Sequence, residues 1–509
     1  MSSAQPIGIN LAFVNDYSLG DYWINRAKQL RVQNGGDLQP LDQEAPYGAY
    51  DNGGTIAYTA DLYPASLSAG QAAGYILQAG TDLALEAGSW VIRWDGTDDV
   101  YLVGGTLPTQ LLSGSGASNR HVVTFTGSTG TSVVSLQGTD IANLEILRLA
   151  DEAAYDAGQK FRTAFLDQLD DFDFVRFLNF QGVNDYAGFT DWADRPTASN
   201  LAYTGPGGVP AEEMIALCNA ASKDAYVHIP HTWTFQTIRS FADLLATTLT
   251  GKIYCEFSNE TWNSLFSQTT WLYDNGERLG YGSERFSSGR RFLAQRSREV
   301  FRIFSDAFAA AGRDLTDLVK MICWQSAQGA AHLPDLLEWR KAYLAVNHYA
   351  TAPYPGGKLG SNANYAATMA LSEAEVVAAV QNEWNNYWTL GGATRNAETL
   401  YDIFAALALL GLQPATYEAG QHLLDETSPT QSGVEAHLRA SAAHGDMAGL
   451  YQSIVSDWFG AGGGPLTILA LNWFPSTSGY WGLYTSDMEE SPSPKLSGLR
   501  AGIAAAAAA

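Results

Sequence analysis

KIYCEFSNETWN, at residues 252–263, is the stretch from which the rest of the chain is best understood. Its first half is apolar and rich in β-formers such as Ile253 and Phe257, and it stops at Asn259 and Glu260. This pattern predicts a buried strand that ends in a polar loop. An acid placed where a buried strand ends is partly desolvated, which moves its pKa upward, toward that of a general acid. Glu260 is therefore the first candidate for a catalytic residue.

Similar apolar runs alternate with helical stretches over the rest of the chain from residue 151 onward. Together with 252–260 and a run near the N-terminus, they give eight predicted strands, at 6–13, 172–180, 225–233, 252–260, 318–325, 342–350, 414–420 and 465–474. Helices are predicted over 22–30, after Pro210, over 284–311 up to Gly312, after the capping box of Ser372 and Glu375, and over 400–410. Eight strands with helices between them predict an α/β fold, the (β/α)8 TIM barrel.

Residues 48–149 have a different character. Gly, Ser and Thr are frequent there, and short β-type runs alternate with turns such as Asp95-Gly96. We expect a β-sandwich module inserted after the first barrel strand, whose aromatic residues form its core rather than a glycan groove. The predicted organisation is a barrel of residues 1–47 and 150–490, the module at 48–149, and a loosely attached Pro/Ser/Ala-rich tail at 491–509.

The composition excludes several classes of partner. The chain has 29 Lys and Arg against 53 Asp and Glu, a formal net charge of −24, which repels nucleic acid and anionic membrane surfaces. We find no apolar run long enough to cross a membrane and no signal peptide, although an extracellular function fits the chain. The three cysteines have no metal or redox spacing, so we expect buried free thiols.

Polar and aromatic residues recur where the predicted strands end, which in a barrel is where an active site lies. Two acids stand out among them, Glu260 after the fourth strand and Glu418 after the seventh. Glycoside hydrolysis requires such a pair, one acid to protonate the leaving oxygen and one carboxylate to act at the anomeric carbon. The other candidates at strand ends are Asn10, Arg176, His228, His231, Trp233, Asn259, Trp262, His348, Tyr349 and Trp473.

The ordered set of Asn259-Glu260, His348-Tyr349, Glu418 in YEAG and Trp473 resembles the clan A glycoside hydrolases, the retaining (β/α)8 group that includes cellulases and mannanases. The resemblance covers residues 1–45 and 150–490. It departs from the usual pattern where Asn-Glu-Pro is replaced by Asn-Glu-Thr.

The resemblance implies a role for each matching residue. It makes Glu260 the acid/base and Glu418 the nucleophile, with Asn259 on the sugar 2-hydroxyl. It also implies that Arg176 steadies the nucleophile and that Tyr349 donates a hydrogen bond to it. It further implies that His231 matches the strand-three histidine and that Trp473 is the floor of the −1 subsite. Apart from the resemblance, His348 is a further substrate-binding candidate, and Trp233 and Trp262 are candidate sugar platforms.

Simpler interpretations exist for several of these residues. Glu260 could be an acid at a helix N-terminus, and Glu418 could simply pair with Arg176 as a buried ion pair. Glu256 is a rival acid, but its deeper position favours a structural role. His228 and His231 lack a third metal ligand, so we expect neither a metal nor another cofactor. Trp192, Trp233, Trp262 and Trp481 could each be subsite or packing residues.

The prediction from sequence is a retaining glycoside hydrolase that cleaves a β-linked poly- or oligosaccharide by double displacement. Two alternatives remain open at this point: a non-catalytic carbohydrate-binding or surface-assembly protein, and a transglycosylase that uses the same two acids.

Overall fold

The computed structural model describes residues 5–16, 20–31, 41–44, 50–51, 56–68, 71–78, 87–127, 130–326, 329–388, 400–426, 433–473, 479–484 and 493–508. The chain divides into two compact units. The barrel unit consists of Met1–Ala12, Gln168–Tyr186 and Cys218–Ala509, and the β unit of Phe13–Asp167 and Ala187–Leu217. The boundaries predicted for the module, 48–149, are narrower than the β unit and stay a prediction.

The barrel unit contains an eight-stranded parallel sheet in the order β18-β17-β16-β15-β14-β13-β1-β19. Its strands are β1 (Ile7–Asn10), β13 (Phe174–Arg176), β14 (Asp224–Ile229), β15 (Ile253–Phe257), β16 (Leu318–Cys323), β17 (His348–Thr351), β18 (Gln413–Thr416) and β19 (Leu466–Ile468). The sheet closes between β18 and β19, where the Thr416 amide donates to the Pro465 carbonyl at 2.9 Å and the Gly464 amide to Pro414 at 2.8 Å. The predicted (β/α)8 barrel is confirmed.

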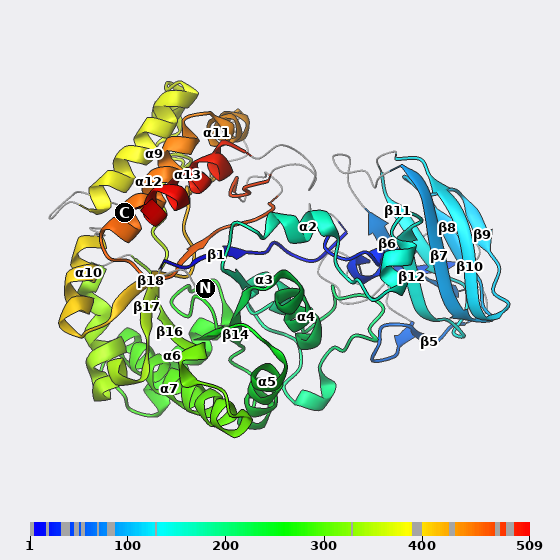
Figure 1. Ribbon diagram of the computed structural model, residues 1–509, viewed down its shortest axis with the longest axis horizontal. Coiled ribbons are helices and arrows are strands. Elements are labelled where there is room, and N and C mark those ends of the chain that lie inside the picture. The colour runs from blue at the N-terminus through cyan, green and yellow to red at the C-terminus, as the bar shows by residue number, and fades with distance from the viewer. Residues whose placement is uncertain are drawn as a thin grey trace. The chain divides into compact units, whose positions relative to one another are not determined.

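Helices follow most of the barrel strands, and Figure 1 shows α5, α6 and α7 side by side next to them. The long helix α7 ends at Gly312, whose φ of 70° is the left-handed cap that the sequence predicted. The capping box of Ser372 and Glu375 at the start of α9 is also present. The helices are α3 (Leu178–Gln181), α5 (Phe235–Thr248), α6 (Ser267–Arg278), α7 (Arg285–Ala311), α8 (Tyr365–Met369), α9 (Glu373–Tyr387), α10 (Leu400–Leu409), α11 (Val434–Ala443), α12 (Met447–Gly460) and α13 (Pro494–Ala508).

The barrel interior is filled by alternate residues of the strands, because successive side chains of a strand point to opposite faces. Phe174, Tyr226 and Tyr254 belong to one buried cluster inside it. Gly8 is required on the neighbouring strand, because a Cβ there would lie 1.9 Å from the Phe174 ring. The residues two positions further along β13 and β15, Arg176 and Glu256, share this inner face and are polar.

The C-terminal segment is not loosely attached, and that expectation is wrong. Residues 494–508 form α13, which lies against α12 and buries Leu496 and Leu499. Gly498 permits the close approach, since a Cβ there would lie 2.0 Å from the Ala448 carbonyl oxygen. A run of alanines with one apolar stripe is a strong helix former, and here it has a partner to cover that stripe.

The β unit contains two larger antiparallel sheets, in the orders β10-β7-β12 and β3-β2-β6-β11-β8-β9, and a small pair of β4 and β5. Its strands are β2 (Leu41–Glu44), β3 (Tyr50–Asp51), β4 (Ala57–Tyr58), β5 (Pro64–Ser66), β6 (Gln71–Gln78), β7 (Gly88–Gly96), β8 (Val100–Val103), β9 (Gln110–Leu112), β10 (Gly116–Phe125), β11 (Ser132–Leu136) and β12 (Ala142–Arg148). The short helix α1 (Glu152–Asp156) follows, and α2 (Thr163–Gln168) and α4 (Ala211–Ala221) run across the boundaries between the units.

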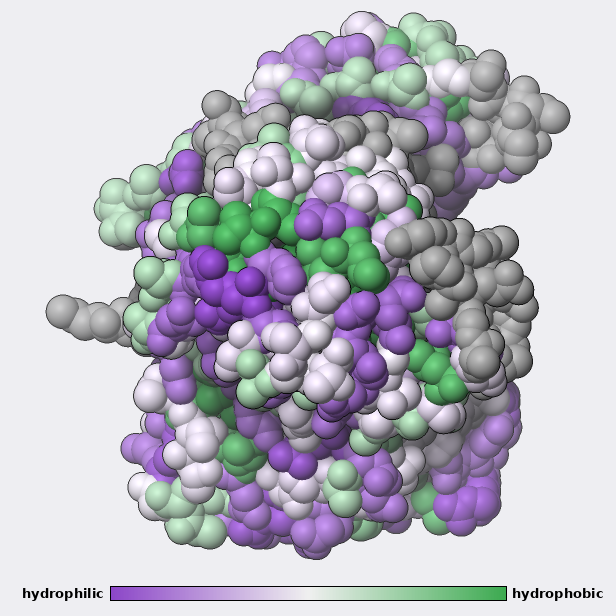
Figure 2. Space-filling model, turned by 90° about the vertical axis from the view of Figure 1, so that its right-hand side faces the viewer, coloured by the Kyte–Doolittle hydropathy of each residue, from purple (hydrophilic) through white to green (hydrophobic). Residues whose placement is uncertain are grey.

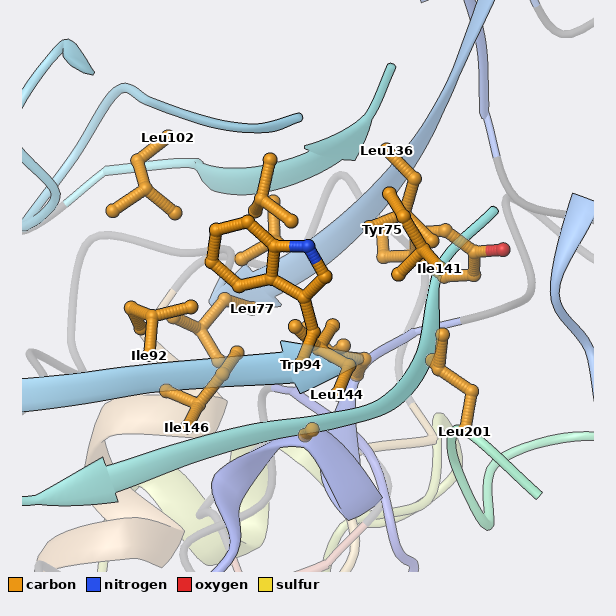
Figure 3. Packing of buried hydrophobic residues seen from close by; sticks show 14 of the residues in the cluster. Tyr75, Leu77, Ile92, Trp94, Leu102, Leu136, Ile141, Leu144, Ile146 and Leu201 are labelled. Carbon is orange, nitrogen blue, oxygen red and sulfur yellow. The ribbon is translucent and has the colours of Figure 1, made fainter. Parts of the chain in front are cut away.

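The two larger sheets of the β unit share one hydrophobic core. Trp94 of β7 is 1% exposed, and Figure 3 shows its indole among Tyr75, Leu77 and Leu136 of the facing sheet. Asp95 and Gly96 end β7, and the bend that leads to the other sheet follows them at 97–98; a Cβ on Gly96 would lie 1.8 Å from the Asp140 carbonyl oxygen. Only a short 3-10 helix, Arg26–Gln29, forms within the helix predicted for 22–30, and on either side of it Trp23 and Arg31 form isolated bridges with Phe161 and Ile76.

The face of the molecule in Figure 2 is mixed in hydropathy, and the three cysteines are as the sequence predicts. Figure 2 shows hydrophilic residues interspersed with small groups of hydrophobic ones on the face in view. Over the described ranges, no helix is both long and apolar enough to cross a membrane. Cys218, Cys255 and Cys323 are buried free thiols, as predicted.

Candidate active site

Arg176 lies at the centre of a hydrogen-bonded group at the carboxyl ends of the barrel strands. It ends β13 and stands in register with Asn10, the last residue of β1. Its Nη1 donates to Glu418 Oε1 at 2.6 Å, and Asn10 Nδ2 donates to the same oxygen at 3.2 Å. Burial alone would lower the pKa of Arg176, but Glu418, Tyr226, Glu256 and Cys323 together outweigh burial and raise the pKa above the ordinary value. The guanidinium is therefore a permanent cation beside Glu418.

The second oxygen of Glu418 accepts a hydrogen bond from Tyr354, whose hydroxyl lies 2.6 Å from Oε2. The sequence assigned this role to Tyr349, and that assignment is wrong. The Tyr349 hydroxyl lies 2.5 Å from His332 Nε2. Tyr354 comes three residues after β17 ends, so it extends past the strand, whereas Tyr349 is the second residue of the strand and is fully buried.

Asn259 is held by Arg176 from one side and by Asn184 from the other. Arg176 Nη2 donates to Asn259 Oδ1 at 2.7 Å, and Asn259 Nδ2 donates to Asn184 Oδ1 at 3.0 Å. Gln268 Nε2 also donates to Asn184 Oδ1, at 2.9 Å, and to the Asn259 carbonyl at 3.0 Å. These bonds fix the amide orientation of Asn259 next to the two acids.

Glu260 lies just past β15, in a backbone conformation with a φ of 39°. Asn263 Nδ2 donates to its Oε2 at 3.0 Å, and the Asn263 amide donates to its carbonyl at 2.8 Å. Burial, and then the charge of Glu418, raises the pKa of Glu260 to about 7. The next helix, α6, begins only at Ser267, so Glu260 is not an acid at a helix N-terminus.

Glu256 lies deeper in the barrel, in a second network that also includes Arg176. Its Oε2 accepts from the Tyr226 hydroxyl at 2.8 Å and lies 3.2 Å from His228 Nε2 and 3.8 Å from Arg176 Nη2. Burial would raise the pKa of Glu256, but His228, Arg176 and the Tyr226 hydroxyl together lower it further than burial raises it. Burial, and then Arg176, lowers the pKa of His228 to about 4. Glu256 therefore forms an ion pair with Arg176 from deeper inside the barrel, the structural role that the sequence predicted for it.

A row of aromatic rings extends from Glu418 through residues that follow β17, β18 and β19. The Tyr354 and His422 rings are 4.6 Å apart between centroids, His422 and Trp481 are 5.9 Å apart, and Trp481 and Trp473 are 5.1 Å apart. The sequence singled out Trp473 and Trp481 but missed His422 and Tyr354. His422 could have been found from its place four residues after Glu418.

Other predicted site residues have different surroundings. Trp262 is half-buried, and its indole N–H adjoins the Tyr417 hydroxyl. Trp233 is buried, and its N–H donates to the Tyr186 hydroxyl at 3.3 Å, so it packs rather than presenting a platform.

The two predicted histidines also differ from each other. His231 is 7% exposed and packs edge-on against Trp271, and burial lowers its pKa. His348 begins β17 and pairs with Gln413, the first residue of β18, so it lies at the opposite end of the strands from Glu418. The proposed substrate contact of His348 is therefore wrong. The run at 342–350 looked like one strand, but η6 (Trp339–Ala345) takes up its first half.

No metal site is found among the described residues, in which no three or more of His, Cys, Asp and Glu are grouped to hold an ion.

No protein-family model and no curated protein matches the chain. Similar solved structures include an endo-β-1,4-xylanase of glycoside hydrolase family 10 from Gloeophyllum trabeum, 14% identical, covering 67% of this chain and 91% of that one with a TM-score of 0.35. A family 10 structure from Paenibacillus barcinonensis is 11% identical, covering 64% and 85% with a TM-score of 0.35. A family 5 endoglucanase from Clostridum cellulovorans is 11% identical, covering 68% and 88% with a TM-score of 0.32. These matches are clan A glycoside hydrolases, the group that the sequence resembles.

Proposed function

We propose that the protein is a retaining glycoside hydrolase that acts on a β-linked poly- or oligosaccharide. The observation that carries the proposal is the unequal environment of two carboxyl groups. Glu418 is held by three donors, from Arg176, Asn10 and Tyr354. Glu260 is desolvated and close enough to Glu418 for that charge to raise its pKa, to about 7. Paired acids in such different surroundings are typical of an acid and a nucleophile with separate roles.

The proposed reaction has two steps. In the first, a Glu418 oxygen forms a bond to the anomeric carbon while Glu260 gives its proton to the departing glycosidic oxygen. In the second, Glu260 takes a proton from water, the water oxygen bonds to the anomeric carbon, and the bond to Glu418 breaks. A group with a pKa near 7 suits both proton transfers.

The surrounding residues have positioning roles in this scheme. Arg176, Asn10 and Tyr354 fix the direction of the Glu418 oxygens. The Asn259 amide, which Arg176 and Asn184 orient, is the candidate to bind a hydroxyl group of the sugar. The half-buried Trp473 and Trp481 suit the C–H face of a sugar ring.

The assignment is tested by the release of reducing ends from a panel of β-glucans, xylans and mannans. We expect Glu418→Gln to abolish release. Glu260→Ala is expected to be slow on polysaccharide and to be partly rescued by azide on a substrate with a good leaving group. Proton NMR of the first product should show the β anomer.

Each alternative gives a different result in the same experiments. An α anomer as the first product would show that the enzyme inverts the anomeric configuration and does not retain it. Glycan binding without new reducing ends would favour a non-catalytic binding protein. Longer oligosaccharides among the products would favour a transglycosylase.

A further inference from the structure

The β unit contains a pocket that is distinct from the two glutamates of the barrel. Its volume is about 200 Å³, and every lining residue belongs to the β unit. Pockets for drug-sized ligands measure about 300–1,000 Å³, so this one has room for a single small ring. The lining residues are Trp23, Asn25, Lys28, Tyr63, Asn143, Leu144, Glu145, Tyr155, Lys160, Ala198, Ser199, Tyr203 and Glu213.

The floor of the pocket is aromatic and buried. Trp23, Tyr63 and Tyr203 are 3%, 9% and 3% exposed, and the Trp23 and Tyr203 rings meet edge to face at 5.3 Å. The Tyr63 hydroxyl accepts from the Leu144 amide at 3.0 Å, which holds the ring in place. Tyr155 of α1 adds a fourth, half-buried ring. The rim differs, because Asn143, Lys160, Ala198 and Ser199 are exposed.

The charges that line the pocket balance. Lys160 Nζ lies 2.5 Å from Glu213 Oε1, and Glu213 is buried. Lys28 Nζ donates to the Asn200 carbonyl at 2.7 Å and lies 4.9 Å from the Tyr203 ring centroid, and burial lowers its pKa to about 8. Glu145 is paired with Arg93 at 2.6 Å. Two lysines and two glutamates line the pocket, so it has hydrogen-bond donors and acceptors but no excess charge to attract an ion.

We propose that this pocket binds one neutral sugar ring, as a free monosaccharide or as the end of a glycan chain. The half-buried Tyr155 ring suits the C–H face of a sugar, the buried Trp23 and Tyr203 rings close the pocket, and the lysine, glutamate and asparagine side chains around them suit the sugar hydroxyls. The volume admits one ring and excludes an oligosaccharide from the interior. The pocket holds neither Glu260 nor Glu418, so its ligand binding does not depend on the proposed catalysis.

The test uses the full chain carrying Glu260→Gln and Glu418→Gln, so that no turnover interferes. Saturation-transfer NMR and calorimetry with glucose, xylose, mannose, galactose and their methyl β-glycosides give the affinities. In that background, Ala198→Trp fills the rim without removing a side-chain hydrogen bond. Ala117→Trp, at an exposed alanine of the β unit outside the pocket, is the matched control.

We expect at least one sugar to bind and Ala198→Trp to weaken it more than tenfold, with Ala117→Trp unchanged. Tyr155→Ala should also weaken binding, with a thermal melt to check that it folds. The proposal is overturned if no sugar of the panel binds, or if binding survives Ala198→Trp. Loss of hydrolysis in the catalytic variants would test the proposed function separately, because they keep this pocket intact.

Discussion

The Arg176 guanidinium donates to Glu418 at 2.6 Å through Nη1 and to Asn259 at 2.7 Å through Nη2. One buried cation thus connects three strand ends, those of β13, β15 and β18. Asn259 directly precedes Glu260, so the guanidinium fixes the backbone position of one acid and the carboxylate of the other. The two acids are 158 residues apart in sequence, and this side chain sets their relation in space.

Removing this cation should affect both stability and catalysis. Arg176→Met leaves Glu418 buried without its ion partner, and breaking a buried pair in this way costs about 3–5 kcal/mol. We expect that loss in urea unfolding, together with a fall in kcat of more than about a hundredfold. Arg239→Met is the matched control, because Arg239 pairs with Asp243 at an exposed site on α5. Its expected cost is below about 1 kcal/mol, and an equal cost for the two variants would contradict the role of Arg176.

The pKa of Glu260 should respond in opposite directions to two neighbours. The charge of Glu418 raises the pKa of Glu260, so Glu418→Gln should lower it from about 7. The Asn263 hydrogen bond lowers the pKa of Glu260, so Asn263→Ala should raise it. Carbon-detected NMR of the glutamate carboxyls across pH 4–9 measures both changes. In the active protein, kcat/KM should fall as pH rises through about 7, because the acid then loses its proton. An unchanged pKa of Glu260 in both variants would show that neither neighbour sets it.

Glu260 should also make folding stability depend on pH. Its pKa is raised from 4.5 in an unfolded chain to about 7 in the folded protein. The folded state therefore favours the protonated form, and this contribution is complete below pH 4.5 and is lost as pH rises through 7. Glu260→Gln should have little effect on the free energy of unfolding at pH 4.5. It should raise that free energy by on the order of 3 kcal/mol at pH 8. Parallel stability curves for variant and wild type would contradict the raised pKa.

The barrel and its two acids could be predicted from sequence because each depends on local patterns. Buried strands leave apolar runs, and Glu260 and Glu418 stand directly where two of them end. The positions of the residues around β17 could not be predicted, since they depend on where this strand starts within an apolar run. The strand begins at His348, which places His348 at the wrong end and turns Tyr349 to the outer face of the barrel, since the next residue, Ala350, belongs to the interior cluster. The hydrogen bond to Glu418 is instead donated by Tyr354. Tyr354 lies in a loop, where the sequence has no periodic pattern from which its contact could be predicted.

Two tyrosines near β17 offer a direct test of this correction. Tyr354→Phe removes the donor to Glu418 Oε2, so kcat should fall by roughly tenfold to a hundredfold, or about 1.4–2.7 kcal/mol. Tyr349→Phe removes a hydroxyl that contacts His332 and should leave kcat within about twofold of wild type. Both changes delete one oxygen, so the pair is closely matched. A larger fall in kcat for Tyr349→Phe than for Tyr354→Phe would support the role predicted for Tyr349.

Lys495 links α13 to the segment that carries Trp481. This buried lysine donates to the carbonyl oxygens of Tyr480 and Gly482, the latter at 3.0 Å, on either side of Trp481. Gln421 Nε2 also donates to the Tyr480 carbonyl, at 2.9 Å, which ties the same segment to the chain just after Glu418. Lys495→Met should therefore loosen Trp481 and raise KM for an oligosaccharide more than it lowers kcat.

Lys495 should also make the free energy of unfolding depend on pH. Burial lowers the pKa of Lys495 from 10.5 to about 7, so the folded state favours the neutral amine. The unfolded chain then binds the extra proton between these values, and stability from this group rises as pH increases from 7 toward 10.5. Relative to Lys495→Met, the wild type should gain on the order of 3 kcal/mol between pH 7 and 9.5. Thermal and urea unfolding at both pH values measure the difference. Lys358→Met, at an exposed lysine, should follow the wild-type curve at both pH values, and the same behaviour in Lys495→Met would rule out a depressed pKa at Lys495.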